Sequence, residues 1–166
     1  VDVLATVDDA FLEEQTLDKG AMTLVDIDRA SEIYAKMPPA QEVSGGSCGN
    51  TMAGFASLGG KGVFIGKVRD DQLGDVFRRD LQSIGVDFFT PATTEGPQTG
   101  SCLVLITPDA QRTMCTNLGA ASNLTPKDID KDIIQAAKVV YMEGYLFDPP
   151  DAQDAFVEAA DLAHDA

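Results

Sequence analysis

The sequence predicts an α/β protein in which short strands alternate with helices around a mostly parallel sheet. Apolar runs of β type alternate with amphipathic segments whose apolar residues recur at helical spacing. Helices of about ten to fifteen residues between such runs are typical of layered α/β folds with parallel strands. The chain has 166 residues, 44% hydrophobic and 23% charged, which favours one globular domain over residues 1–166.

Clear strand and helix signals mark the first part of the chain. Residues 1–7, VDVLATV, have the apolar pattern of a strand. Residues 26–37 place apolar side chains on one helical face and offer Asp26 as the N-cap. A further helix is expected from Asn50 to a pair of glycines. Residues 62–68, GVFIGKV, then predict a buried strand.

A helix and a hairpin are expected in the middle of the chain. Asp70 or Asp71 can cap a helix that carries an apolar stripe and that Gly85 ends. The segments SCLVLIT and RTMCTN flank the turn PDAQ and predict a β-hairpin. Three β-like segments lack an intervening helix and are expected to form an accessory sheet, namely 18–25, 39–43 and 86–93.

Helix and strand signals alternate again in the last part of the chain. TPKDIDKDIIQAAK predicts a helix with Thr125 as N-cap and Pro126 at the first helical position. Residues 138–147, KVVYMEGYLF, predict a buried strand, and a last helix is expected from residue 150 onward. The chain begins without methionine and ends in helix-forming residues without a C-cap glycine, so we expect a piece of a longer protein.

The charge balance and the cysteine count argue against several classes of function. The net charge is −15 and the isoelectric point about 4.1, so the surface repels phosphate backbones and we expect no nucleic-acid partner. No apolar run approaches the roughly 18–20 residues that cross a bilayer, so no membrane partner is expected. Cys48, Cys102 and Cys115 match neither a disulfide framework nor a metal-binding spacing, which favours a reducing cytoplasm. The single histidine, His164, is expected on a helix surface, and no metal site is predicted.

The glycine-rich loop SGGSCGN, residues 44–50, is the first candidate for chemistry. A Walker loop needs a Lys-Ser/Thr pair after its last glycine, where this chain has Asn50, and the spacing also fails the dinucleotide fingerprint. Glycines allow a ligand to approach the backbone, free N–H groups at a helix start donate hydrogen bonds, and Asn50 adds a donor and an acceptor. Two readings remain open from the residues alone: a clamp for sugar hydroxyls and a glycine turn without a ligand.

Two carboxylates lie inside apolar strand patterns. Asp2 stands between valines in the first predicted strand, where it either accepts two adjacent hydroxyls or faces water at an edge. Glu143 stands in VVYMEGY, where a carboxylate needs a partner or a functional reason, and it is the weaker candidate.

The stretch GGSCGNTMAGFASLGGKGVFIGKVRDDQLGDVFRRDLQSIGVDF resembles the first signature region of the PfkB/ribokinase family of carbohydrate and nucleoside kinases. VDVLATVDD is similar to the family's first strand, and GPQTGSCLVLITPDAQRTMCTNLGAAS to its central hairpin. The resemblance covers essentially the whole chain and is closest to the adenosine-kinase-like branch. It implies a three-layer α/β/α ribokinase-like domain with a small β lid over the substrate, to which 18–25, 39–43 and 86–93 would contribute.

The resemblance also implies a reaction and the residues that hold its substrate. The reaction is transfer of the γ-phosphoryl group of ATP, with Mg²⁺, to the primary hydroxyl of a nucleoside or sugar. A homodimer through the lid is a further expectation. The residues implied in substrate binding are Asp2, Gly46 and Asn50 for vicinal hydroxyls, with Gly45 shaping the loop, and Met114, Thr116 and Leu118 for the base, with Tyr145 as a neighbour.

One departure from the family pattern concerns catalysis. The second family signature, a D-T-x-G-A-G-D stretch that supplies the catalytic base and an anion hole, is absent from these residues, as is the N-x-x-E motif. We therefore expect no catalytic residue in this chain and only a small part of the ATP site. The alternatives to an adenosine-kinase-like enzyme are a sugar kinase for ribose, fructose or a keto-sugar acid, and a non-catalytic protein that binds a sugar or nucleoside.

Overall fold

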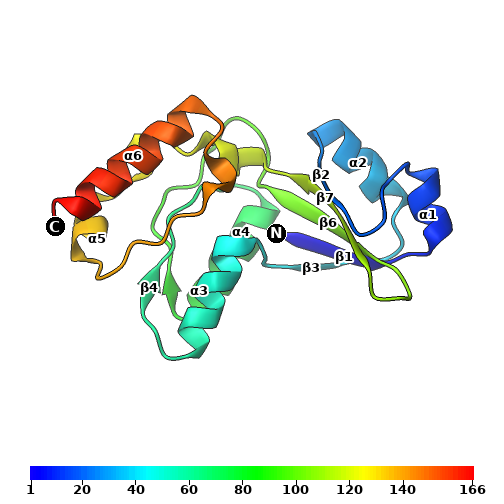
Figure 1. Ribbon diagram of the computed structural model, residues 1–166, viewed down its shortest axis with the longest axis horizontal. Coiled ribbons are helices and arrows are strands. Elements are labelled where there is room, and N and C mark those ends of the chain that lie inside the picture. The colour runs from blue at the N-terminus through cyan, green and yellow to red at the C-terminus, as the bar shows by residue number, and fades with distance from the viewer.

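The computed structural model describes residues 1–166 and has two parts that lie side by side (Figure 1). One part is a five-stranded sheet with two helices, and the other holds the remaining helices and a two-stranded sheet. The strands are β1 (Asp2–Thr6), β2 (Met22–Leu24), β3 (Gln41–Val43), β4 (Gly62–Val63), β5 (Val86–Asp87), β6 (Ser101–Ile106) and β7 (Arg112–Asn117). The α-helices are α1 (Asp9–Glu14), α2 (Ile27–Lys36), α3 (Ser47–Ser57), α4 (Gln72–Ser83), α5 (Lys131–Ala136) and α6 (Pro150–His164). Three 3₁₀ turns complete the chain: η1 (Gly119–Asn123), η2 (Pro126–Asp128) and η3 (Gly144–Leu146).

The five-stranded sheet is mixed and has the strand order β2-β7-β6-β1-β3. β1 runs parallel to β6 and antiparallel to β3, β2 runs parallel to β7, and β6 and β7 form the predicted antiparallel hairpin. The second sheet, β4-β5, is parallel. Parallel pairs thus outnumber antiparallel ones, as predicted, and the hairpin and β3 make the larger sheet mixed.

One face of the five-stranded sheet packs against α1 and α2. Side chains alternate along a strand, so Val3, Leu103 and Cys115 point to the same face. They form one buried cluster with Leu12 of α1 and Ile33 of α2. The two helices cover only this face, which leaves the other face of the sheet for the candidate site (Figure 1).

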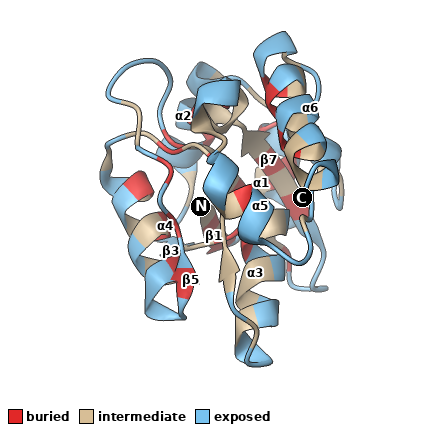
Figure 2. Ribbon diagram, turned by 90° about the vertical axis from the view of Figure 1, so that its left-hand side faces the viewer, coloured by how far each residue is buried: buried red, intermediate tan, exposed pale blue.

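A second core lies between α4 and the β4-β5 sheet. The rings of Phe64, Phe77 and Phe88 pack edge to face, with centroids 5.2 to 5.9 Å apart. Arg78 lies over the Phe88 ring at 4.4 Å and donates hydrogen bonds to the carbonyls of Phe88 and Thr90. Figure 2 shows buried residues in both parts of the molecule, so each part has a core of its own.

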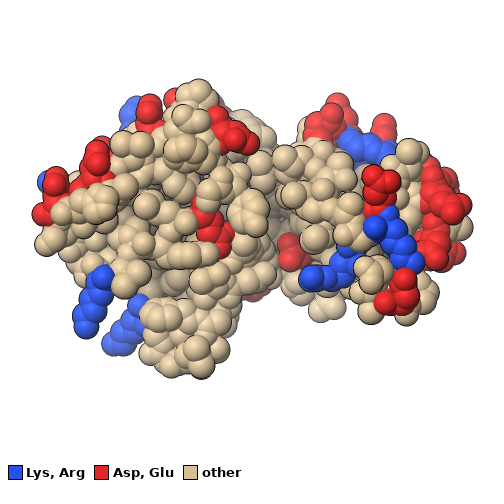
Figure 3. Space-filling view, viewed as in Figure 1, with Lys and Arg blue, Asp and Glu red and all other residues tan.

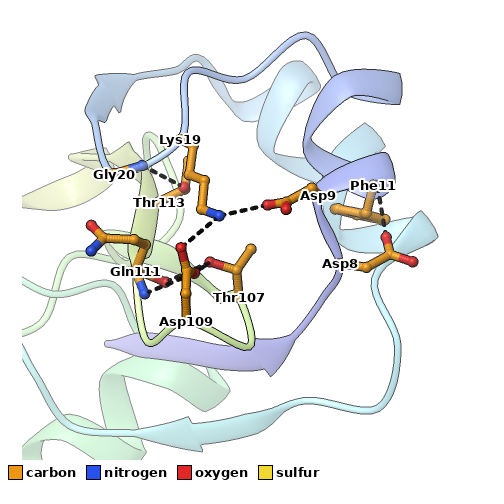
Figure 4. A network of polar contacts seen from close by, with 9 residues as sticks. All are labelled: Asp8, Asp9, Phe11, Lys19, Gly20, Thr107, Asp109, Gln111 and Thr113. Carbon is orange, nitrogen blue, oxygen red and sulfur yellow. Dashed lines mark hydrogen bonds and ion pairs between the residues drawn. The ribbon is translucent and has the colours of Figure 1, made fainter.

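The helices that the sequence signals most clearly form as predicted. Asp26 caps α2 through a bond from the N–H of Arg29, and Asp71, rather than Asp70, caps α4. The six-residue helix α1 was not predicted, because VDDAFLEE is too short for its apolar period to stand out. Lys19 binds both Asp9 of α1 and Asp109 in the β6–β7 turn, so α1 is tied to the tip of the hairpin (Figure 4).

The buried strand predicted for residues 138–147 is wrong. The segment contains only η3, and the side chains of Val139, Tyr141 and Met142 are 82%, 57% and 44% exposed. No backbone hydrogen bond joins residues 138–143 to another backbone group. A strand forms only where a neighbouring backbone completes its ladder, and none of the described segments pairs with this one.

Three smaller predictions also need correction. Of residues 62–68, only Gly62 and Val63 form a strand. The single helix expected over 125–138 divides, because Asp128 folds back to cap η2 and Asp130 begins α5. The segments 18–25 and 39–43 supply the two edge strands of the five-stranded sheet. Segment 86–93 instead pairs with β4, so the three do not form one accessory sheet.

Candidate functional site

Asp2 opens β1 and lies in a row of side chains that crosses the sheet. It is in register with Val43 of β3 and with Cys102 of β6, and Cys102 is in register with Thr116 of β7. Because the neighbouring residues of each strand point into the core beneath α1 and α2, this row lies on the uncovered face. Thr116 Oγ1 donates to Cys102 Sγ at 3.3 Å, which joins two members of the row.

The Asp2 carboxylate lies against the backbone of Gly45. A Cβ atom built on Gly45 would come 2.1 Å from Asp2 Oδ2 and 2.6 Å from Oδ1, so no residue with a side chain fits there without displacing Asp2. Burial raises the pKa of Asp2, and the charges of the Val1 amino group and of Arg112 only partly oppose this effect. The site therefore holds a half-buried carboxylate at the start of the glycine loop.

The loop 44–50 leads directly into α3. Gly46 is the N-cap residue with φ of 87°, a left-handed conformation that favours glycine, and α3 has no side-chain cap. The N–H of Asn50 donates to the carbonyl of Gly46 at 2.9 Å, whereas the N–H groups of residues 47–49 make no hydrogen bond. These groups, with the exposed amide of Asn50, are donors for an oxygen ligand.

Two contacts hold this loop against α4. Ser44 Oγ donates to Asp80 Oδ2 at 2.6 Å. Gly49 lies so close to Phe77 that a Cβ atom on it would approach the ring to 3.3 Å. The loop is thus held against α4 by Ser44, just before Gly45, and by Gly49, shortly after Gly46.

Glu143 is brought to the start of α3 from the far end of the sequence. Its carboxylate accepts hydrogen bonds from the hydroxyls of Ser47 and of Tyr141, the latter at 3.0 Å. Burial, with the charge of Glu143 as a second cause, raises the pKa of Cys48 to about 11. The bond to Glu143 raises the pKa of Tyr141. Both groups keep their protons at neutral pH, so neither is an activated nucleophile.

Of the four residues predicted for a base pocket, the structure places two on the same face of the sheet as Asp2. Met114 and Thr116 lie on β7 and share the uncovered face with Asp2. Leu118 follows β7 and is half-buried beside Gly100, where a Cβ atom would meet its carbonyl oxygen at 2.5 Å. Tyr145 lies in η3, is 70% exposed and makes no side-chain hydrogen bond.

The sequence interpretation missed three residues of this region: Ser47, Cys102 and Tyr141. Ser47 belongs to the quoted loop, but its partner is 96 residues away. Cys102 would follow from the alternation of the hairpin strand once the face of Asp2 is known. Tyr141 lies in a segment that was expected to form a buried strand, and nothing in that local pattern indicates a hydrogen bond from its hydroxyl to Glu143.

Other parts of the surface offer less. A hollow of about 430 Å³ is lined by residues 69–73 and Gln98, remote in sequence from Asp2 and the loop. Of its two acids, Asp70 and Asp71, the second already accepts hydrogen bonds from Gly74 and Thr99 as a helix cap, so we assign Asp71 a structural role. No group of three or more His, Cys, Asp or Glu side chains is placed to hold a metal ion. No helix is both long enough and apolar enough to span a bilayer.

Comparison with known proteins agrees with this geometry. The sequence model described as pfkB family carbohydrate kinase matches residues 20–166. A crystal structure of adenosine kinase from Sinorhizobium meliloti superposes with a TM-score of 0.92 at 49% identity, covering 99% of this chain and 50% of that one. A probable sugar kinase from Rhizobium etli gives a TM-score of 0.92 at 44% identity, with the same two coverages.

A curated relative gives a similar result. Adenosine kinase of Saccharomyces cerevisiae is 32% identical over 163 residues, covering 92% of this chain and 47% of the yeast protein. The chain therefore spans about half the length of the relatives that it matches. Its fold is the ribokinase-like α/β fold of these structures.

Proposed function

Because the chain belongs to the pfkB family of carbohydrate kinases, we propose that its protein transfers the γ-phosphoryl group of ATP to the primary hydroxyl of a nucleoside, with adenosine the first choice. The observation that carries the proposal is the contact between the Asp2 carboxylate and Gly45, two residues before the start of α3. The similarity to adenosine kinases supports the choice of adenosine.

The proposed clamp recognises two adjacent hydroxyls. The Asp2 carboxylate accepts hydrogen bonds from both, and the Asn50 amide accepts or donates one more. Gly45 and Gly46 allow the ribose to approach the backbone, where a Cβ atom would intervene. Holding the ribose by two hydroxyls orients its primary hydroxyl, and such orientation is the main contribution that a protein makes to phosphoryl transfer.

The five-stranded sheet is the proposed lid. Its uncovered face carries Asp2 together with Met114 and Thr116, and we propose that the base rests on these two residues. The segments 18–25 and 39–43 form its edges, whereas 86–93 belongs to the other part of the molecule. Closure of this sheet over the substrate would exclude water from the transferred group.

ATP is the proposed phosphoryl donor, and Mg²⁺ would neutralise charge on its phosphates. The residues described here lack a donor cluster for the metal, so no role in holding it is assigned to them. We propose that the catalytic base and most of the ATP site lie in the part of the relatives' length that this chain does not span.

Surface charge, the free cysteines and the open face of the sheet bear on the partners and the location of the protein. Acidic side chains outnumber basic ones on the face drawn in Figure 3, which supports a small-molecule partner and argues against nucleic acid. All three cysteines are free thiols, which is consistent with a reducing cytoplasm. A homodimer through the lid stays a prediction, and α1 and α2 leave it only the open face and the edges of the sheet.

A sugar kinase is the second candidate, because the probable sugar kinase from Rhizobium etli is nearly as similar as the adenosine kinase. Release of ADP from ATP separates the two when the full-length protein is offered adenosine, ribose, fructose and a keto-sugar acid in parallel. We expect release with adenosine and none with 5′-deoxyadenosine, which lacks the accepting hydroxyl. Release with a sugar alone would replace adenosine as substrate, and binding of adenosine without release would favour the non-catalytic alternative.

A further inference from the structure

The contact between Ser44 and Asp80 joins the glycine loop to α4. Ser44 lies between the end of β3 and Gly45, and Asp80 lies near the end of α4. The Ser44 hydroxyl donates to Asp80 Oδ2 at 2.6 Å, across 36 residues of sequence. Both residues are half-buried. Asp80 takes part in no ion pair, so the Ser44 hydroxyl is the only partner of its carboxylate.

This bond is the only hydrogen bond that holds the first two residues of the loop. The backbone N–H and carbonyl groups of residues 44 and 45 make no hydrogen bond, and Ser44 contributes its hydroxyl alone. Backbone bonding resumes at Gly46, whose carbonyl accepts from the N–H of Asn50. A segment without backbone hydrogen bonds opens and moves at low free-energy cost. The side chain of Ser44 therefore limits the motion of Gly45.

The face of α4 that carries Asp80 is itself fixed by the second core. Phe77 and Asp80 are three residues apart and lie on the same side of the helix. The Phe77 ring is buried among the other phenylalanines of that core and lies against Gly49. Asp80 thus offers the Ser44 hydroxyl an acceptor on a helix that packing holds in place.

The position of Gly45 matters because of Asp2. Gly45 is buried, and its α-carbon lies closer to the Asp2 carboxylate than any side chain would permit. Asp2 is held by its register with β3 and β6, whereas Gly45 belongs to no strand. A shift of Gly45 would change the space that the proposed ribose hydroxyls occupy beside Asp2.

We infer that Asp80 is a positioning residue for the proposed clamp: through the Ser44 hydroxyl it holds Gly45 in the place beside Asp2 that the ribose hydroxyls require. This inference rests on the proposed function. Asp80 acts through Ser44, without a contact of its own to the substrate. Loss of either partner therefore has the same effect, and loss of both has no larger effect.

The test is a double-mutant cycle in the full-length protein, read by steady-state kinetics with adenosine and ATP. Asp80→Ala and Ser44→Ala are each expected to raise KM for adenosine about tenfold, the effect of losing one hydrogen bond to a charged group. We expect kcat and KM for ATP to stay within about twofold of the wild type, because the lost interaction serves nucleoside binding. The double variant should match either single variant.

Conservative variants and a control on the same helix sharpen the test. Asp80→Asn keeps an oxygen that accepts from Ser44, and Ser44→Thr keeps the hydroxyl, so both should stay within about threefold of the wild type. Asp75→Ala is the matched control, since Asp75 is exposed in the first turn of α4 and its side chain makes no hydrogen bond. It should leave all three kinetic constants unchanged.

Four kinetic outcomes would overturn the inference. Wild-type KM for adenosine in Asp80→Ala would show that the contact positions nothing. An equal rise of KM for ATP would show a general effect on the fold. A double variant about a hundredfold weaker would show that Ser44 and Asp80 act independently. An Asp80→Asn variant as weak as Asp80→Ala would show that the bond to the hydroxyl is not what matters.

A second readout separates this inference from the proposed function. The NMR order parameters of the Gly45 and Gly46 amides are expected to fall from about 0.85 toward 0.6 in Asp80→Ala and to stay unchanged in Asp75→Ala. If the wild type phosphorylates neither nucleosides nor sugars, the proposed function fails, and the order parameters still decide whether Asp80 orders the loop. Unchanged order parameters in Asp80→Ala contradict the inference whatever the activity.

Discussion

The carboxylate of Asp2 and the α-carbon of Gly45 lie so close together that a methyl group on Gly45 would come 2.1 Å from Asp2 Oδ2. This contact links the first strand to the glycine loop, and in the proposed clamp a ligand oxygen would meet both. At position 45 a glycine is needed because a side chain would collide with Asp2. At position 46 a glycine is favoured because the backbone has a φ of 87°.

Gly45→Ala is the first prediction that follows. The new methyl group displaces the Asp2 carboxylate, so we expect a free energy of unfolding lower by about 1–3 kcal/mol and a weaker affinity for the nucleoside. Gly54→Ala in the middle of α3 is the control, because a Cβ atom there meets nothing within 4 Å. It should stabilise the protein by about 0.5–1 kcal/mol, and equal destabilisation of both variants by urea unfolding would contradict the account.

Local patterns in the sequence predicted the elements that are stabilised locally. Asp26 and Asp71 cap helices within their own segments, and the β6–β7 hairpin closes over a short turn, so neighbouring residues suffice to recognise them. Residues 138–147 have the same quality of apolar pattern, yet no strand forms, because a strand depends on a partner that no local pattern supplies.

In the candidate site, too, local patterns predicted residues within one segment but not the contacts between distant segments. Asp2, Gly45, Gly46 and Asn50 could be named from the loop, its strand and a family resemblance. The bond between Ser47 and Glu143 spans 96 residues, and only the folded chain brings the two together. The expectation that Tyr145 neighbours the base pocket comes from the family resemblance alone and stays a prediction.

Asp2→Asn is expected to stabilise the folded protein at neutral pH. Burial raises the folded-state pKa of Asp2, so its ionised form destabilises the fold above that pKa, and the cost disappears when the pH falls below the unfolded value near 3.8. The asparagine variant carries no such cost. Urea unfolding from pH 3 to 8 should show a stability gain that shrinks toward acid pH. A loss of stability at pH 7 would contradict the assignment.

The Lys19–Asp109 pair predicts a pH dependence of the opposite sign. The bond from Lys19 lowers the pKa of Asp109 to about 2, so its stabilising contribution is present above the ordinary value of 3.8 and is lost as the pH falls through about 2 (Figure 4). Asp109→Asn should be less stable than the wild type at pH 6, with the difference narrowing between about pH 4 and 2.

The ion pair between Lys67 and Asp128 is the more costly one to break. Its atoms are 2.6 Å apart and its side chains only 17% and 7% exposed, so Lys67→Met leaves a buried carboxylate without its cation. We expect a loss of about 3 kcal/mol in urea unfolding. Lys36→Met is the control, since its pair with Glu14 is exposed and 3.9 Å apart, and it should change stability by less than about 0.5 kcal/mol. Equal losses would show that burial does not distinguish the two pairs.

The exposed apolar side chains of residues 138–147 predict that the 166-residue chain binds apolar molecules. Val139, Tyr141, Met142 and Tyr145 expose large side chains on one segment, and such a surface binds apolar dyes and promotes association. Val139→Lys combined with Met142→Lys should lower the fluorescence of bound ANS and favour the monomer in size-exclusion chromatography. Val157→Lys removes an isolated apolar side chain on α6 and should change neither. An equal effect of both changes would place the apolar surface elsewhere.

The hydroxyl clamp is tested most directly by KM for adenosine in the full-length protein. Asp2→Ala should raise it on the order of 100-fold and Asn50→Ala about tenfold, the effects of losing two and one hydrogen bonds of a charged or amide group. Neither should change KM for ATP. Asp154→Ala and Asn123→Ala, which alter exposed residues without side-chain hydrogen bonds, should match the wild type. Wild-type KM for adenosine in both Asp2→Ala and Asn50→Ala would contradict the clamp.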